Sequence, residues 1–420
     1  MKAVADNPAP TVPGEPSRRP ELLAPAQDFT CLQAAINAGC DAVYFGIGEL
    51  NMRSAARNIR PEDLPEFARL CHAAGVKAYL ALNVIVFEHE LPAVRALLDA
   101  AVGHVDAVIA WDPAVLAACR ERGLAIHVST QASVANAATA RFYRDLGAVR
   151  IIPARECTLE EVACIRAAAA IEVETFVHGA MCVSYSGRCF LGQDVFGKSG
   201  NRGACLQPCR REYLITEVEE GDQYILGQDY VLSARDLCTI PFLEELIEAR
   251  IDAFKIEGRN RNPEYVETVV SCYRQAIDAY FARALTADLK AALVNRLGQV
   301  YNRKFSDGFY HGRPVASFTA SRRSQAEYRK EYVGLVKNYY DRARVVAVSV
   351  LSNTFRVGDE LLIQGKTTGV VRFTAGEIRV EDTPVEEAPR GVVTLKLDTL
   401  VREGDKVYVR VLRQGKSAGE

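Results

Sequence analysis

The chain has 420 residues, of which 49% are hydrophobic and 25% are charged, and its formal net charge is −2. This length allows two or three domains, and the composition is that of an ordinary globular protein. The small net charge excludes a general attraction to nucleic acid or to an anionic membrane surface. A partner of either kind must therefore be bound by a local basic patch.

The first twenty residues, 1–20, contain five prolines and no continuous apolar run. This composition predicts a disordered Pro-rich tail and not a secretory signal peptide. No apolar stretch approaches the length of a membrane span, so we expect a cytoplasmic protein with no membrane partner. Disulfides are rare in that compartment, and the twelve cysteines are expected to be mostly thiols, with any cluster of them holding metal.

From residue 21 onward, short apolar runs alternate with amphipathic segments. The predicted strands cover 21–26, 41–46, 77–86, 105–111, 125–131, 149–154, 171–179 and 251–258. Most are continuous apolar runs, which is typical of parallel strands buried on both faces. Between them lie helices with clear end signals, such as the capping box of Thr158 and Glu161 and the terminal Gly75 and Gly123.

Eight strands alternating with helices predict an α/β fold, a TIM-like (β/α)8 barrel that with its trailing helices covers 21–320. A doubly wound open sheet is the alternative, but the chain lacks a Gly-x-Gly-x-x-Gly motif after the first strand. A cysteine-rich loop, 180–250, separates the last two strands and holds five of the twelve cysteines. In a barrel this loop lies at the C-terminal face, where active sites are built.

After a charged joint at 321–331, the pattern changes to alternating polar and apolar residues. Turn signals recur every eight to twelve residues, roughly the spacing of a small antiparallel barrel. We therefore predict a small β-barrel domain at 330–415.

The cysteines of the long loop are Cys182, Cys189, Cys205, Cys209 and Cys238. Glycine, serine, arginine and asparagine surround them, which disfavours simple core packing. The Cys182–Cys189 spacing is wider than the close pairs of most zinc sites. An iron–sulfur cluster accepts thiolates that long loops deliver singly, so the residues lean towards a cluster while zinc and core thiols stay open.

The stretch ETFVHGAMCVSYSGRCFLG, at 174–192, resembles the signature of the collagenase-like peptidase family U-32. That signature reads Glu-x-Phe-x-x-Gly-Ala-hydrophobic-Cys, four residues, then Gly-x-Cys-x-hydrophobic. Gly192 stands where the family pattern has serine. The likeness extends to NRGACLQPCR, SARDLC and FKIEGR and across the barrel.

Branches of this family resemble oxygen-independent hydroxylation systems that bind a 4Fe–4S cluster through four cysteines. By motif, the resemblance implies the metal ligands Cys182, Cys189, Cys205 and Cys238. Cys209 is the alternative to Cys205, which is preferred because it follows the Gly203-Ala204 step.

Chain length and the C-terminal β domain look most like the tRNA 5-hydroxyuridine synthase branch. This likeness implies tRNA as partner, hydroxylation of the wobble uridine to 5-hydroxyuridine, and a small carboxylate co-substrate, with prephenate as oxygen donor. Ribosomal-RNA hydroxylation, quinone hydroxylation and the peptidase activity of the family name are the alternatives. The sequence leaves the oligomeric state open.

Strand ends and the loops after them supply the candidate side chains. The predicted catalytic residues are His178, Lys255 and Glu257, and the predicted substrate-binding residues are Arg53, Arg57, Arg155 and Arg259. Lys255 and Glu257 share one strand face and are expected to pair with each other. Arginine forks suit RNA phosphates or a carboxylate donor. A structural histidine, a structural ion pair and a solvated basic face are the alternatives.

Overall fold

The computed structural model describes residues 18–54, 56–184, 186, 188–211, 213–226, 233–314, 317–319 and 324–413. Most of the predicted disordered tail, 1–20, lies outside these ranges, as do the last two residues of the predicted domain 330–415. Within the described ranges, none of the helices combines the length and the apolar character needed to cross a membrane.

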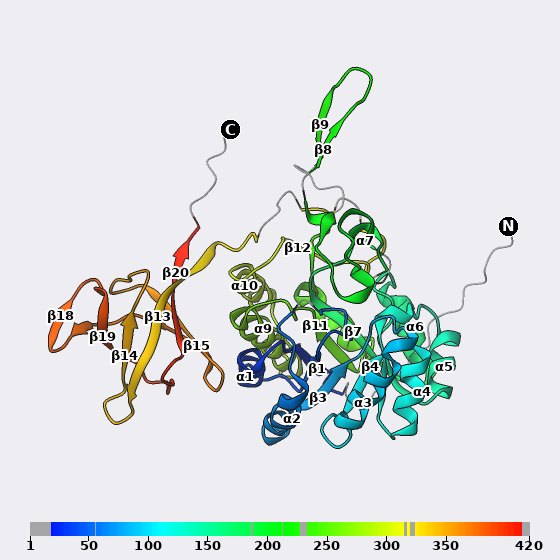
Figure 1. Ribbon diagram of the computed structural model, residues 1–420, viewed down its shortest axis with the longest axis horizontal. Helices are drawn as coiled ribbons and strands as arrows, with labels where there is room; N and C mark the ends of the chain where they lie inside the picture. The colour runs from blue at the N-terminus through cyan, green and yellow to red at the C-terminus, as the bar shows by residue number, and fades with distance from the viewer. Residues whose placement is uncertain are drawn as a thin grey trace.

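Eight parallel strands close into a ring within the described part of the chain (Figure 1). They are β1 (Glu21–Pro25), β2 (Ala42–Phe45), β3 (Lys77–Ala81), β4 (Ala107–Ala110), β5 (Ile126–Val128), β6 (Ala148–Ile151), β7 (Glu172–Gly179) and β11 (Ala253–Ile256). Each strand from β1 to β6 pairs with the next one, and β11 pairs with both β7 and β1. This closure confirms the predicted TIM-like (β/α)8 barrel and excludes an open sheet.

Helices surround the ring. They are α1 (Phe29–Asn37), α2 (Leu64–Ala73), α3 (Leu91–Ala101), α4 (Pro113–Glu121), α5 (Ala137–Asp145), α6 (Leu159–Ala169), α8 (Leu243–Glu248), α9 (Pro263–Phe281) and α10 (Ala287–Gly298). The Asp28 side chain accepts a hydrogen bond from Cys31 N at the start of α1. Thr158 and Glu161 form the predicted capping box at the start of α6. These caps satisfy N–H groups that a helix leaves free at its first turn.

The inside of the ring carries buried charges as well as apolar side chains. Lys255 Nζ donates to Glu174 Oε1 at 2.7 Å, and Arg150 Nη1 lies 3.3 Å from Glu174 Oε2. Arg150 Nη1 also lies 2.6 Å from Glu21 Oε1. Arg150 also pairs with Glu172 Oε2 at 2.8 Å, so each of the two cations is matched by carboxylates, which makes their burial tolerable.

The segment between β7 and β11 is folded over the C-terminal ends of the strands. It contains α7 (Leu191–Phe196), β8 (Tyr213–Thr216), β9 (Gln223–Leu226) and β10 (Asp236–Cys238). β10 runs antiparallel to β7 and parallel to β12 (Phe305–Ser306), and thereby extends the barrel sheet. The β8–β9 hairpin projects away from the barrel (Figure 1).

A second, antiparallel sheet follows the barrel. Its strands are β13 (Tyr328–Tyr340), β14 (Val345–Val350), β15 (Glu360–Gly365), β16 (Gly369–Thr374), β17 (Ile378–Val380), β18 (Thr383–Val385), β19 (Gly391–Lys396) and β20 (Lys406–Leu412). The sheet wraps around its own core, which includes Val333, Phe355 and Leu361. Its two end strands, β16 and β18, do not pair with each other among the described residues, so the predicted antiparallel domain is a bent sheet there.

The second sheet docks on the outside of the barrel, against α1 and α9. Lys330 Nζ lies 2.6 Å from Glu264 Oε2, and Gln364 Nε2 donates to the same carboxylate at 3.1 Å. Asn37 Nδ2 donates to Thr368 O at 3.2 Å. These contacts fix the sheet beside the barrel. The C-terminal mouth of the barrel is left free for the cysteine-rich loop, 180–250, which we call the cysteine segment.

Candidate functional site

A cavity of about 180 Å³ lies at the C-terminal mouth of the barrel, beneath the cysteine segment. Its walls come from strand ends and the loops after them, from residues within 180–210, and from Arg303 and Phe309. The polar and charged side chains that line it are Arg53, Asn83, Ser129, Thr130, Gln131, Arg155, Glu156, Ser184, Ser186, Gln207, Arg210, Lys255, Glu257, Arg259, Asn260 and Arg303. A strand-end cavity of this kind is where TIM-barrel enzymes place their chemistry.

Three arginines surround one carboxylate on the barrel side of the cavity. Arg53 donates to Glu257 Oε1 from Nε at 3.2 Å and from Nη2 at 2.9 Å. Arg155 Nη2 lies 3.9 Å from Glu257 Oε2. Burial raises the pKa of Glu257, but the charges of the arginines outweigh it and lower that pKa to about 2. Glu257 is therefore ionised at neutral pH.

Arg259 is the third of these arginines, and it has an unused donor. The residue is 3% exposed and lines the cavity, and its Nη1 has no hydrogen-bond partner among the described residues. Gly46 lies directly beside it, because a Cβ at that position would be 2.6 Å from Nη1. A buried N–H group without an acceptor is costly, so this geometry suits an anionic ligand that supplies the acceptor.

Lys255 lines the cavity but does not pair with Glu257, contrary to expectation. Its Nζ is held by Glu174 at 2.7 Å and lies 4.4 Å from the centre of the Tyr44 ring. Glu174 reaches Lys255 from the neighbouring strand β7, whereas Glu257 turns towards Arg53 in the loop after β2. The alternation along β11 placed both side chains inside the barrel but could not identify their partners.

His178 and Arg57 lie outside the cavity. The His178 ring is buried among Tyr265, Tyr273 and Phe305, and burial lowers its pKa to about 3. A neutral imidazole in an aromatic box is a packing residue, so the structure does not bring the predicted acid–base group to the site. Arg57 is exposed and absent from the cavity lining.

Four cysteines line the cavity: Cys182, Cys189, Cys205 and Cys209. Cys182 and Cys205 are exposed, and the other two are half-buried. Backbone N–H groups of Ser184 and Gln207 donate to the sulfurs of Cys182 and Cys205, each at 3.4 Å. The thiolate is the form of cysteine that binds metal.

Cys238 is not part of this group. It lies on β10, is 3% exposed, and pairs across the strands with His178. Its sulfur accepts a weak hydrogen bond from Tyr273 Oη at 3.9 Å within the barrel core. Cys209, the alternative ligand, therefore lies at the cavity with Cys182, Cys189 and Cys205, whereas the predicted ligand Cys238 lies outside its lining.

The residues fit the iron–sulfur cluster that the resemblance implies, as judged by their chemistry. Four thiols from glycine-rich backbone face one cavity, while seven other cysteines are buried. As the described side chains stand, no three cysteine, histidine, aspartate or glutamate residues already surround a metal position. The donor set is thus present, although its sulfurs are not closed around a metal position.

The cysteine segment is fixed to the barrel rim at several points. Ser186 donates from Oγ to Glu156 Oε2 at 2.5 Å and from N to Oε1 at 2.6 Å. Arg202 forms an ion pair with Glu90. Gly203 lies so close to the loop after β2 that a Cβ there would overlap Asn51 O. These contacts hold the cysteines over the cavity.

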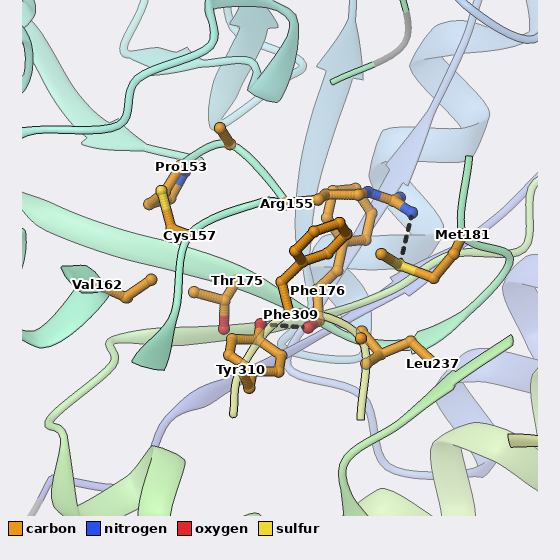
Figure 2. Close-up of a pocket in the computed structure, with 12 residues that line it drawn as sticks. Pro153, Arg155, Cys157, Val162, Thr175, Phe176, Met181, Leu237, Phe309 and Tyr310 are labelled. Atoms are coloured by element: carbon orange, nitrogen blue, oxygen red, sulfur yellow. Dashed lines mark hydrogen bonds between the residues drawn. The ribbon is translucent and has the colours of Figure 1, made fainter. Parts of the chain in front are cut away.

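Arg155 connects this rim to the barrel interior. Its guanidinium carbon lies 3.7 Å from the centre of the Phe176 ring, and its Nη1 donates to Ala180 O at 2.7 Å. Figure 2 shows Arg155 over Phe176 and reaching Met181. These three residues line a small, mostly apolar pocket of about 20 Å³. Arg155 is therefore held in place by packing as well as by charge.

Acidification is expected to remove the stabilisation that Glu257 provides. Its pKa falls from about 4.5 to about 2 in the folded protein, so the contribution is complete above pH 4.5 and is lost as pH falls towards 2. A shift of this size corresponds to about 3 kcal/mol. Urea unfolding followed by Trp111 fluorescence should find Glu257→Gln less stable by that amount at pH 7, with the difference shrinking below pH 4. A constant difference across this range would contradict the assignment.

Comparison with known proteins identifies the family. The profile described as Peptidase family U32 matches residues 27–319, which include the barrel and its cysteine segment. The chain belongs to peptidase family U32. This membership confirms the resemblance found in residues 174–192.

Relatives within this family carry different names. A protein named collagenase from Porphyromonas gingivalis is 37% identical over 402 residues, covering 92% of this chain and 97% of that protein. A tRNA hydroxylation protein of Bacillus subtilis is 32% identical over 432 residues, covering 99% and 100%. A 23S rRNA 5-hydroxycytidine synthase of Escherichia coli is 34% identical over 304 residues, covering 71% and 46%.

Proposed function

We propose that this U32 protein hydroxylates RNA, converting the wobble uridine of tRNA to 5-hydroxyuridine with the help of a 4Fe–4S cluster. The observation that carries the proposal is the set of four thiols lining a cavity that Arg53, Arg155 and Arg259 also line. Relatives named for tRNA hydroxylation and for rRNA 5-hydroxycytidine synthesis support the reaction class.

The cluster would be held by Cys182, Cys189, Cys205 and Cys209. A bound iron–sulfur cluster supplies one-electron transfer. The N–H groups of Ser184 and Gln207 donate to two of the sulfurs, and hydrogen bonds to sulfur tune the potential of such a cluster.

A small anionic co-substrate would bind at Arg53, Arg155 and Arg259. Replacing C5–H of uracil with C5–OH adds one oxygen atom and removes two electrons from the base. The co-substrate must therefore donate the oxygen atom and accept the electrons, and we assign this role to a carboxylate, with prephenate as the expected donor. Arg259 Nη1 offers such a carboxylate a free hydrogen-bond donor. Lys255, held by Glu174, and the ionised Glu257 are the remaining candidate catalytic groups.

Peptidase activity finds less support in the site. A cysteine peptidase needs an imidazole within hydrogen-bond reach of its nucleophile. The cavity lining contains four cysteines but no histidine among the described residues, and His178 is buried elsewhere. The name of one relative, collagenase, makes gelatin cleavage the control assay.

Nucleoside mass spectrometry tests the proposal. Digested tRNA from a strain lacking this gene should contain no 5-hydroxyuridine or its derivatives, and the wild-type gene should restore them. An Arg259→Gln gene is expected to restore less than a tenth of the wild-type level, since removing a positioned charged donor costs roughly 10²-fold. Unchanged wobble uridines in the deletion strain would overturn the tRNA assignment. Altered rRNA nucleosides or quinones would then identify the substrate.

A further inference from the structure

A second group of three arginines surrounds a single buried carboxylate, and two of these arginines, Arg210 and Arg303, line the cavity. Asp236, at the start of β10, is 3% exposed, and its Oδ2 accepts a hydrogen bond from Arg303 N at 3.2 Å. Burial raises the pKa of Asp236, and the charges of Arg303, Arg261 and Arg210 act against this rise. We call Arg210, Arg261 and Arg303 the Arg303 cluster. Its three cations face one carboxylate, which leaves two positive charges unbalanced.

Arg303 has donors that the protein does not use. The residue is 3% exposed and lines the same cavity as the cysteines. Its Nη2 donates to Gln207 Oε1 at 3.2 Å, whereas Nε and Nη1 have no hydrogen-bond partner among the described residues. Nη1 lies 3.6 Å from Asp236 Oδ1, which is too long for a hydrogen bond. A buried guanidinium with unpaired N–H groups is satisfied when a ligand supplies the missing hydrogen-bond acceptor.

The Arg303 cluster extends from the cavity towards the protein surface. Arg210 and Arg261 are half-buried, and Gln207 is exposed. The guanidinium carbon of Arg261 lies 3.6 Å from the centre of the Tyr301 ring, which is also half-buried. A long ligand can therefore contact this cluster from outside while one of its groups enters the cavity. By contrast, Arg259 lies at the barrel end of the cavity, next to Gly46, which directly follows β2.

We propose that the Arg303 cluster binds a backbone phosphate of the RNA whose base enters the cavity. This inference rests on the proposed RNA function. Arginine forks match phosphate oxygens, and most contacts between proteins and nucleic acids are made to the backbone. Chemistry on a base requires that the base leave its stack, and the phosphate beside it must then be held near the cavity entrance. Each arginine group thus binds a different ligand. The group around Arg259 binds the small carboxylate, and the Arg303 cluster binds the phosphodiester.

The salt dependence of tRNA binding tests this assignment. The probe is a fluorescently labelled, unmodified tRNA transcript, titrated with the anaerobically purified full-length protein at several salt concentrations. Loss of one phosphate contact lowers the slope of log affinity against log salt by about 0.7 to 0.9. Arg303→Gln is expected to show this reduction, together with about tenfold weaker binding at low salt. Arg303→Lys keeps the charge and is expected to retain the slope of the wild type.

Arg379→Gln is the matched control, because Arg379 lies on β17 of the second sheet and pairs with Glu377. It is expected to leave the slope unchanged. If Arg303→Gln fails to fold, the half-buried Arg261→Gln is expected to give the same reduction. A wild-type protein that binds no tRNA would overturn the proposed RNA function itself. Salt-dependent binding by the wild type with an unchanged slope in Arg303→Gln or Arg261→Gln would overturn only the phosphate site.

Discussion

Replacing Cys209 with alanine is expected to remove the iron of anaerobically purified protein, whereas Cys238→Ala is expected to retain it. Cys209 lines the cavity with three other cysteines, but Cys238 is packed against Tyr273 in the barrel core. Loss of a ligand should lower iron content by at least about tenfold, the loss seen even when a residue that merely supports a ligand is removed. Iron and sulfide per chain are the measurements.

Two controls separate metal binding from folding in this experiment. Cys238→Ala removes one buried sulfur and should cost about 1 kcal/mol of stability without bleaching the protein. Cys272→Ala, at another fully buried cysteine, should behave in the same way. Iron lost from Cys238→Ala but kept in Cys209→Ala would restore the ligand set inferred from the motif. A colourless wild-type protein loaded with zinc would refute the cluster.

Gly203→Ala is expected to displace the cysteine segment from the barrel rim. Gly203 has φ +81°, and a Cβ there would overlap Asn51 O and lie 2.8 Å from Ser54 N. The backbone of the loop after β2 cannot move aside as a flexible side chain could, so the cysteines must shift. A shift of 1 Å costs about 10²-fold in activity, and a loss of this order in tRNA hydroxylation is expected.

Gly197→Ala is the matched control for Gly203→Ala. Gly197 also has a positive φ, +63°, but a Cβ there would have no neighbour within 4 Å among the described residues. Both variants pay about 1 to 2 kcal/mol for a left-handed alanine. Only Gly203→Ala adds the overlap with the rim. Similar losses of activity and iron in the two variants would place the effect in backbone strain and not in the contact with Asn51.

The barrel could be predicted from sequence because its signals are local. Apolar runs gave the strand positions, and Thr158 with Glu161 gave the start of α6. The third strand was predicted to run from 77 to 86, yet β3 ends at Ala81. Leu82 and Val84 remain buried although they lie beyond the strand. An apolar run indicates that residues are buried but not that they form a strand. Residues of a loop that packs against the core are buried as well.

The site was only partly predictable, because its pairs join distant segments. Strand alternation placed Lys255 and Glu257 inside the barrel, but their partners come from β7 and from the loop after β2. Cys238 matched a family motif, yet the antiparallel pairing of β10 with β7 turns it into the core. In the sequence, Arg303 could be recognised only as a basic residue in a polar loop. Which side chains pair depends on the register between distant segments, and the spacing of residues in the sequence does not determine that register.

Closure of the barrel by β11 has a consequence for the order of events during synthesis. A chain leaves the ribosome from its N-terminus, so all four cavity cysteines emerge before β11 at residues 253–256. The ring that carries their anchoring loops is incomplete until β11 pairs with β1 and β7. The thiols are therefore not positioned together until β11 has been made and has paired. Under the proposed function, these four thiols can hold a cluster only after that step.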